Sequence, residues 1–159
     1  MLTNGRYHLM ITREGTGFSR WDKLALTRWS DDAVGGGLGS FCYIRDESSG
    51  VVWSTTPQPV NKGEDVVQAN FSVGRASFIR RHSNGSLDVT ARTDIVVDPE
   101  NDLELRRVNV HNLSGELRTL SVTSYLEVVL GNATADAAHP AFEKLFVESE
   151  LLPEWQAIL

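Results

Sequence analysis

The sequence predicts an all-β domain built as an antiparallel β-sandwich, and three observations predict it. Alternating apolar and polar residues recur along most of the 159 residues. Turn residues separate these segments about every 8–12 residues, which is typical of sandwiches. No segment sustains the period of an amphipathic helix. Because a lone sheet with one apolar face would be marginally stable, the apolar faces of two sheets must pack together.

The N-terminal part is predicted to form short strands and loops. Arg6–Thr12 alternates so that Tyr7, Leu9 and Ile11 share one face. Further strands are predicted at Leu24–Arg28, Ser40–Arg45 and Val51–Ser54. Ser30–Gly39 is predicted to be a loop because it is rich in glycine, and it lacks the Gly-Lys-Ser/Thr ending of a phosphate-binding loop. No nucleotide site is therefore predicted there.

The middle of the chain holds the most regular strands. They are predicted at Asp65–Ser72, Arg75–His82 and Ser86–Val97. Asn84-Gly85 predicts a tight hairpin turn, because this pair readily takes the positive φ that such turns need. In the next strand, Leu103–Asn112, the apolar residues change parity halfway. One extra residue would restore the apolar face, so a β-bulge is predicted near Arg106-Arg107.

The functional prediction depends on Leu117–Phe146. Its first half is predicted to be one long strand, Leu120–Leu130, with alternate apolar residues in the core. Its second half has a candidate helical turn at Thr134–Ala138 and then His139–Phe146 (HPAFEKLF). Aromatic, basic and acidic side chains crowd together in this last segment, directly after a rigid strand, which is how many binding sites are built. A terminal helix is a further candidate at Leu152–Leu159.

Charge and cysteine content exclude several classes of protein. The net charge of −6 disfavours nucleic acid as a partner, because phosphate binding needs a basic face. The single cysteine, Cys42, lies in an apolar strand and is predicted to be in the core, and no intramolecular disulfide can form. No apolar run approaches the roughly 20 residues of a membrane span, and no secretory leader is visible. We therefore expect a cytoplasmic segment without membrane contact, although a parent protein could be anchored in the inner membrane.

No catalytic constellation or metal-binding pattern is visible, but three clusters of residues are candidates for binding. The first is Phe18–Trp21 with Arg28-Trp29 close behind, because aromatic faces stack on sugar rings and arginine bonds hydroxyl groups. The alternative is that both tryptophans pack in the sandwich and both arginines are solvated. The third is Arg106-Arg107, for which the alternative is a solvated strand edge.

The second cluster is the segment His139–Phe146. It is either a ligand-facing loop or an aromatic plug that closes the end of the barrel, with Glu143 and Lys144 exposed. Residues alone leave both alternatives open. The plug would be formed by Pro140, Phe142 and Phe146.

An ordered set of short motifs covers nearly the whole chain. The motifs are Asn4-Gly5-Arg6-Tyr7, Gly17-Phe18-Ser19-Arg20-Trp21, Thr27-Arg28-Trp29, Tyr43-Ile44-Arg45-Asp46, Val52-Trp53-Ser54, Gln58-Pro59, Arg106-Arg107-Val108, Thr123-Ser124-Tyr125-Leu126-Glu127 and His139–Phe146. Together they resemble the N-terminal sandwich domain of glycoside hydrolase family 94, the inverting sugar phosphorylases of the cellobiose phosphorylase type. The resemblance is greatest to the phosphorylase-like region of bacterial cyclic β-1,2-glucan synthases and to β-1,2-oligoglucan phosphorylases.

The resemblance implies a supersandwich at residues 1–150, with 151–159 as the truncated start of a following segment. In the family, a linker helix and a catalytic (α/α) barrel follow, so the chain would be a fragment that need not complete the sandwich. The general acid would lie in the barrel, so no catalytic residue is expected in this chain. The resemblance further implies no cofactor, phosphate as co-substrate of the parent enzyme, a β-glucan oligosaccharide as ligand, and a homodimer.

The resemblance also implies which residues face the sugar. Phe142, Glu143 and Lys144 match a segment that approaches the sugar-binding mouth, with His139 beside them. Cellobiose phosphorylases carry an amide and an arginine at the places of Glu143 and Lys144; lysine keeps the positive charge but loses the bidentate donor. The segment that contains Arg20 and Trp21 also lies near the mouth in the family.

Three functions remain open from the sequence. The first is a catalytically silent domain that shapes the sugar-binding mouth and the dimer interface of a phosphorylase or glucan synthase. The second is a free-standing carbohydrate-binding module that uses Trp21, Trp29 and Trp53 as stacking platforms. The third is a purely structural interaction domain.

Overall fold

The computed structural model describes residues 1–29, 37–60 and 65–159, with every side chain there except that of Glu143. In this part of the chain the strands form sheets of five, four and three strands and a two-stranded hairpin. Every pair of neighbouring strands is antiparallel. The predicted all-β, antiparallel sandwich is therefore confirmed. Most of the Gly-rich segment Ser30–Gly39 lies outside the described residues.

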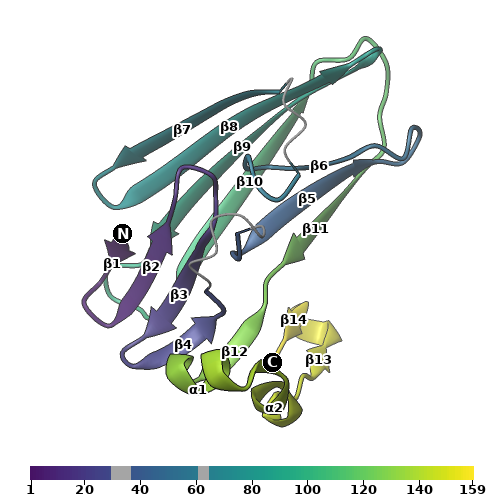
Figure 1. Cartoon of the computed structure of the whole chain (residues 1–159). Helices are drawn as coiled ribbons and strands as arrows, with labels where there is room; N and C mark the ends of the chain where they lie inside the picture. The colour runs from purple at the N-terminus through teal and green to yellow at the C-terminus, as the bar shows by residue number, and fades with distance from the viewer. Residues whose placement is uncertain (30–36, 61–64) are drawn as a thin grey trace.

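The three larger sheets are shown in Figure 1. The five-stranded sheet has the order β1 (Leu2–Thr3), β2 (Tyr7–Ile11), β3 (Gly17–Trp21), β4 (Leu24–Thr27) and β12 (Val128–Gly131). The four-stranded sheet has the order β10 (Glu104–Asn112), β9 (Leu87–Val97), β8 (Arg75–Asn84) and β7 (Val66–Ser72). The three-stranded sheet has the order β11 (Leu120–Tyr125), β5 (Phe41–Asp46) and β6 (Val52–Ser54).

The remaining elements are short and follow β12. They are α1 (Ala133–Ala138), α2 (Pro140–Glu143), the 3-10 turns η1 (Lys144–Phe146) and η2 (Pro153–Trp155), and the hairpin strands β13 (Leu151–Leu152) and β14 (Ala157–Ile158). The helical turn predicted near Thr134–Ala138 is confirmed by α1. The terminal helix predicted at Leu152–Leu159 is wrong, because this stretch forms the β13–β14 hairpin around η2. Among the described residues, no helix is long and apolar enough to cross a membrane.

The four-stranded sheet is the long layer against which the two other sheets pack (Figure 1). One core cluster joins it to the inner face of the five-stranded sheet: Leu2, Tyr7, Leu9, Ile11, Ala76, Phe78 and Ile95. The other joins it to the three-stranded sheet: Ile44, Trp53, Leu87, Val89 and Ala91. The face predicted for Tyr7, Leu9 and Ile11 on β2 is confirmed by the first of these clusters. Gly85, with φ of 60°, supplies the positive φ at the predicted turn between β8 and β9.

A buried polar cluster holds the loop after β6 against β8. The Arg80 side chain is 0% exposed and its Nε donates to the Asp65 carboxylate at 2.6 Å. The same guanidinium donates to the Thr56 carbonyl at 2.6 Å. His82 bonds Asp65 through Nδ1 at 2.8 Å and its ring stacks on Trp53, with centroids 4.7 Å apart. Trp53 is therefore a core residue and not a surface platform.

The β-bulge predicted near Arg106-Arg107 is wrong. β10 pairs with β9 in one unbroken register along its whole length. The apolar parity changes because the inward face of β10 begins with polar residues, while Leu105 points outward and is exposed. Glu104 faces inward and accepts hydrogen bonds from the Tyr7 hydroxyl at 3.0 Å and from Arg106 Nε at 2.7 Å. Satisfied polar groups thus take positions that the pattern assigned to apolar ones.

The predicted long strand Leu120–Leu130 is two strands in different sheets. β11 pairs with β5, whereas β12 pairs with β4. The chain crosses between the two sheets, and the register of β12 is irregular at Leu130, which has φ of 53°. The parity of the side chains therefore shifts along the segment. Leu126 and Leu130, both expected in the core, are exposed, and Val129 is buried instead.

Candidate functional site

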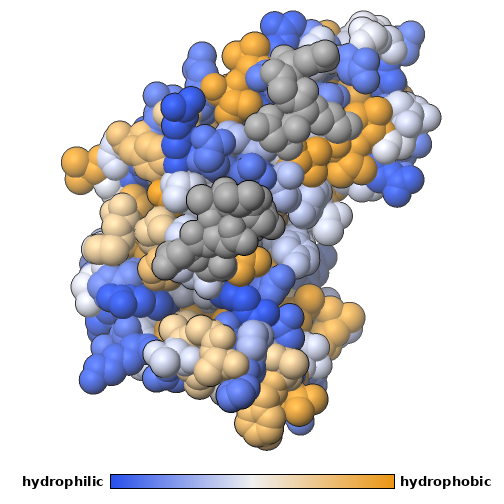
Figure 2. Space-filling view, in the orientation of Figure 1, coloured by the Kyte–Doolittle hydropathy of each residue, from blue (hydrophilic) through white to orange (hydrophobic). Residues whose placement is uncertain are grey.

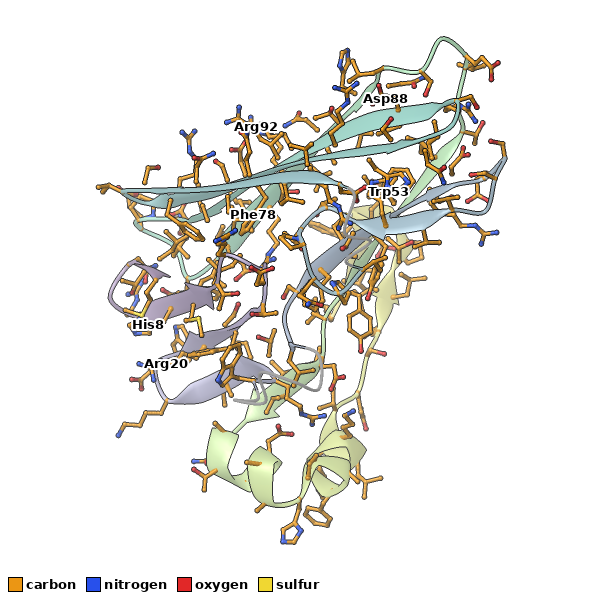
Figure 3. The ribbon with its side chains drawn as sticks, turned by 45° about the horizontal axis from the view of Figure 1, so that its top comes forward. His8, Arg20, Trp53, Phe78, Asp88 and Arg92 are labelled. Carbon is orange, nitrogen blue, oxygen red and sulfur yellow. The ribbon has the colours of Figure 1, made fainter. Side chains whose placement is uncertain are left out.

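β3 presents two kinds of side chain on its two faces. Ser19 points inward and donates to Glu104 at 2.6 Å, as the alternation from Leu9 on the paired strand requires. Phe18 and Arg20 therefore lie on the outer face of the five-stranded sheet. Figure 3 shows Arg20 on the side of this sheet that faces away from the core residue Phe78. The outer face of β3 is thus available for binding.

Arg28, directly after β4, bonds two residues that lie 99 and 108 positions further along the chain. Its Nε donates to Asp136 at 2.8 Å and its Nη2 to the other oxygen of the same carboxylate. Its Nη1 donates to Glu127 at 2.8 Å. The Arg28 side chain is 13% exposed and that of Asp136 is 8% exposed, so this is a nearly buried, bidentate ion pair. The bond to Asp136 raises the pKa of the Arg28 guanidinium above its usual value.

Asp136 reaches Arg28 because α1 lies across the end of the sheet. The side chain of Asn132 caps this helix by accepting from the backbone N–H groups of Thr134 at 2.8 Å and Ala135 at 3.3 Å. The cap sets where the helix begins, and the fourth helical residue then points at the guanidinium. We refer to Arg28, Glu127, Asp136 and Lys144 as the Arg28 cluster. The four charges of this cluster balance.

The segment His139–Phe146 is attached to the same cluster. His139 ends α1, and Pro140 occupies the first position of α2. Lys144 begins η1 and lies 3.6 Å from the Glu127 carboxylate while its side chain remains 54% exposed. The segment is thus tied to the sheet through Glu127 but presents its lysine to solvent.

A pocket of about 330 Å³ opens on the outer face of the five-stranded sheet, and we call it the outer pocket. Its lining residues come from β3, β4, β12 and α1 and from the chain beside β4: Phe18, Arg20, Lys23, Ala25, Thr27, Arg28, Trp29, Val129, Ala133, Asp136 and Ala137. The Phe18 and Trp29 rings contact each other, with centroids 5.7 Å apart and planes tilted by 56°. The buried Arg28–Asp136 pair therefore sits beside a half-buried aromatic pair.

The structure separates some predicted residues and joins others. Arg20 lines the outer pocket, whereas Trp21 points the other way, is 44% exposed, and donates from Nε1 to Asp102 at 2.7 Å. Arg28, expected to be solvated if not binding, is nearly buried. The first and second clusters of the sequence are brought together through Arg28. The third is not part of this site, because Arg106 faces inward.

The aromatic residues of the second cluster do not form a plug in the described part of the chain. Phe142 and Phe146 contact each other edge to face, with centroids 5.1 Å apart. Both rings are exposed, so they close no core. His139 is also exposed, and the side chain of Glu143 lies outside what the structure describes.

Sequence reasoning missed Glu127 and Asp136. Glu127 lies on the face of the segment that was predicted to be polar, and Asp136 lies in a run of small residues, so each looked like a solvated group. Asp136 is 108 positions from Arg28, and no local pattern indicates their pairing. Among the described residues, no group of three or more His, Cys, Asp or Glu side chains could hold a metal ion.

Comparisons with known proteins agree on one family. The model for the supersandwich domain of glycosyl hydrolase 94 matches residues 1–159. The chain is 36% identical over 151 residues to the cyclic beta-(1,2)-glucan synthase NdvB of Rhizobium meliloti (strain 1021). The aligned region covers 95% of this chain and 5% of that protein. It is 30% identical over 112 residues to an N,N'-diacetylchitobiose phosphorylase of Vibrio proteolyticus, covering 70% of this chain and 14% of that enzyme. The phosphorylase of the same name from Vibrio furnissii is 29% identical over 99 residues, covering 62% of this chain and 12% of the enzyme. The chain thus spans a small part of the curated relatives it matches.

Proposed function

Because the chain belongs to the supersandwich domain family of glycosyl hydrolase 94, we propose that it is a non-catalytic domain of a larger phosphorylase or glycosyltransferase acting on β-glucans. The segment His139–Phe146 shapes the sugar-binding mouth of that enzyme. The catalytic (α/α) barrel of the same polypeptide performs the reaction, with phosphate as co-substrate in a phosphorylase. The domain also contributes to the interface of a homodimer.

One observation carries this proposal: the segment is held firmly but left open. The nearly buried Arg28–Asp136 pair fixes α1, from which the segment continues, and Lys144 lies 3.6 Å from Glu127. The lysine and the two phenylalanine rings nevertheless face solvent. A rigid scaffold that presents a cation and aromatic rings is suited to orienting a neutral sugar.

The exposed apolar residues near this segment support a protein contact as well. Besides the two phenylalanine rings, large apolar side chains are exposed on η1 and the terminal hairpin: Leu145, Leu151, Trp155 and Ile158. Figure 2 shows hydrophobic residues gathered at this end of the molecule. Exposed apolar patches of this kind mark interaction sites. The same patch is therefore the surface that we assign to the barrel or the dimer partner.

The proposal is tested in the full-length parent enzyme. Lys144→Ala is expected to raise KM for the acceptor sugar with little change in kcat, because the lysine contacts the sugar outside the reacting atoms. Arg45→Ala is a matched control, since Arg45 is an exposed cation on the remote three-stranded sheet. Unchanged kinetics for Lys144→Ala would contradict the proposal, as would sugar 1-phosphate release by the 159-residue chain alone.

The alternative of a free-standing carbohydrate-binding module has less support. Trp53 is buried, and Trp21 and Trp29 do not share a face. Titration of β-1,2-linked glucooligosaccharides against tryptophan fluorescence separates the alternatives. Saturable binding by the chain alone that is tighter than roughly millimolar would favour the module. Clean dimerisation without any sugar binding, in the chain and in the parent, would favour a purely structural domain.

A further inference from the structure

We propose that the outer pocket is a carbohydrate subsite that takes one pyranose ring of a β-glucan, separate from the segment His139–Phe146. The inference rests on the proposed function for its ligand class. It adds a second place where the chain contacts the sugar and names the residues that form it. Phe18, Trp29 and Arg20 are the contacts, and the Arg28–Asp136 pair holds the opposite wall, α1, in place.

The size and place of the pocket fit a single ring. Its volume of about 330 Å³ lies at the small end of the range of ligand sites. It opens on the outer face of the five-stranded sheet and not between the sheets, so packing of the sandwich does not fill it. α1 forms its far wall through Ala133, Asp136 and Ala137, which are small or held in place by Arg28.

The aromatic wall gives the pocket its preference for a ring. Phe18 and Trp29 are both half-buried, and the planes of their rings are tilted by 56° relative to each other. The two rings therefore form a V-shaped aromatic wall. The apolar face of a pyranose packs against such a wall, and its hydroxyl groups then point away from the wall. A fully buried ring such as Trp53 could not act in this way.

The polar groups divide into fixed and free ones. Each nitrogen of the Arg28 guanidinium donates to Asp136 or Glu127, and the pair with Asp136 ties α1 to the end of β4. By contrast, no described residue bonds the Arg20 guanidinium or the Lys23 ammonium, and both line the pocket. Free donors beside an aromatic wall can bond sugar hydroxyl oxygens without first breaking an internal ion pair.

The outer pocket and the segment His139–Phe146 also share a support. Asp136 lines the pocket, and Glu127 bonds both Arg28 and Lys144. A glucan chain that lies across α1 would therefore meet two sites fixed to the same arginine.

The test is an NMR titration of the ¹⁵N-labelled chain with a β-1,2-linked glucose disaccharide. Saturable shifts are expected at residues 17–29 and 133–137, with a dissociation constant in the roughly millimolar range. Phe18→Leu and Arg20→Gln are expected to weaken binding by about fivefold or more. Trp21→Phe is the matched control, because it lies on the same strand but on the other face, and it is expected to leave the affinity unchanged.

The outcomes separate this subsite from the proposed function. Lys144→Ala tests the proposed function, and an effect of Lys144→Ala with none of Phe18→Leu would support the proposed function and overturn the subsite. The subsite is also overturned if the chemical shifts do not saturate at disaccharide concentrations well above roughly millimolar. A separate titration uses inorganic phosphate, first alone and then in competition with the disaccharide. Phosphate that competes with the sugar and binds more tightly would show an anion site at Arg20 and Lys23, which also overturns the proposal.

Discussion

Replacing Arg80 by methionine should be among the most destabilising single changes in this chain. Arg80 is 0% exposed, and its removal leaves the Asp65 carboxylate, 4% exposed, without its cation. The carbonyls of Thr56 and Val60 also lose donors at 2.6 and 2.7 Å. Breaking a buried pair by removing one partner costs about 3–5 kcal/mol, because an uncompensated charge stays buried. That is a large part of the ~5–15 kcal/mol by which a domain is typically stable.

The assay is urea unfolding of the chain followed by tryptophan fluorescence, since Trp53 lies beside the cluster. With a slope near ~2 kcal/mol per molar urea, the midpoint should fall by about 1.5–2.5 M. Adding Asp65→Asn should recover part of the loss, because the amide removes the unpaired charge.

Arg81 provides the matched control on the same strand. It forms an equally short pair with Asp88, at 2.5 Å, but on the solvent side of β8. Arg81→Met should shift the urea midpoint very little, because water and salt screen an exposed pair. Equal shifts for Arg80→Met and Arg81→Met would refute the reasoning that burial, and not the ion pair as such, sets the cost.

Two further predictions concern pH. Arg92 and Ser77 bond the Asp94 carboxylate and lower its pKa from 3.8 to about 2, so its contribution to stability is present above pH 4 and is lost as the pH falls toward 2. In the Asp94→Asn variant, the thermal unfolding midpoint should fall less steeply as the pH is lowered from 4 toward 2. A fall as steep as in the unchanged chain would contradict this. Burial raises the pKa of the Tyr7 hydroxyl from 10.0 to about 12, so its contribution is present below pH 10 and is lost as the pH rises toward 12. Tyr7→Phe should remove this loss of stability at alkaline pH. It should also remove one tyrosine that ionises late from the pH titration of absorbance at about 295 nm. Ionisation of Tyr7 near pH 10 would disprove the assignment.

Local features of the fold were predictable from the sequence. Tyr7, Leu9 and Ile11 alternate over a short strand, and burial on one face follows directly. Gly85 marks a turn that needs positive φ, which glycine adopts without steric cost. Cys42, predicted to be in the core, is only half-buried in β5, and this burial raises the pKa of its thiol.

Features that depend on long-range contacts were not predictable in the same way. Glu104 takes an inward position only because Tyr7, Ser19 and Arg106 satisfy it there, and all but Arg106 are distant in sequence. The predicted strand is interrupted after Tyr125 because its first part pairs with β5 in one sheet and its last part pairs with β4 in another. At the candidate site, Arg20 was identified, whereas the role of Asp136 depends on a contact that no local pattern encodes.

The pairing of β4 with β12 has a consequence for how the domain is made. Thr27 is paired with Val128, so about 100 residues of chain must be synthesised between the two strands. Contacts of such large sequence separation form slowly, because the loop-closure entropy is lost before they contribute. On the ribosome, β2, β3 and β4 would emerge as a meander long before α1 exists. The Arg28–Asp136 pair and the far wall of the outer pocket are therefore among the last features to form, and a nascent chain stalled before α1 should expose Phe18 and Trp29 to chaperones.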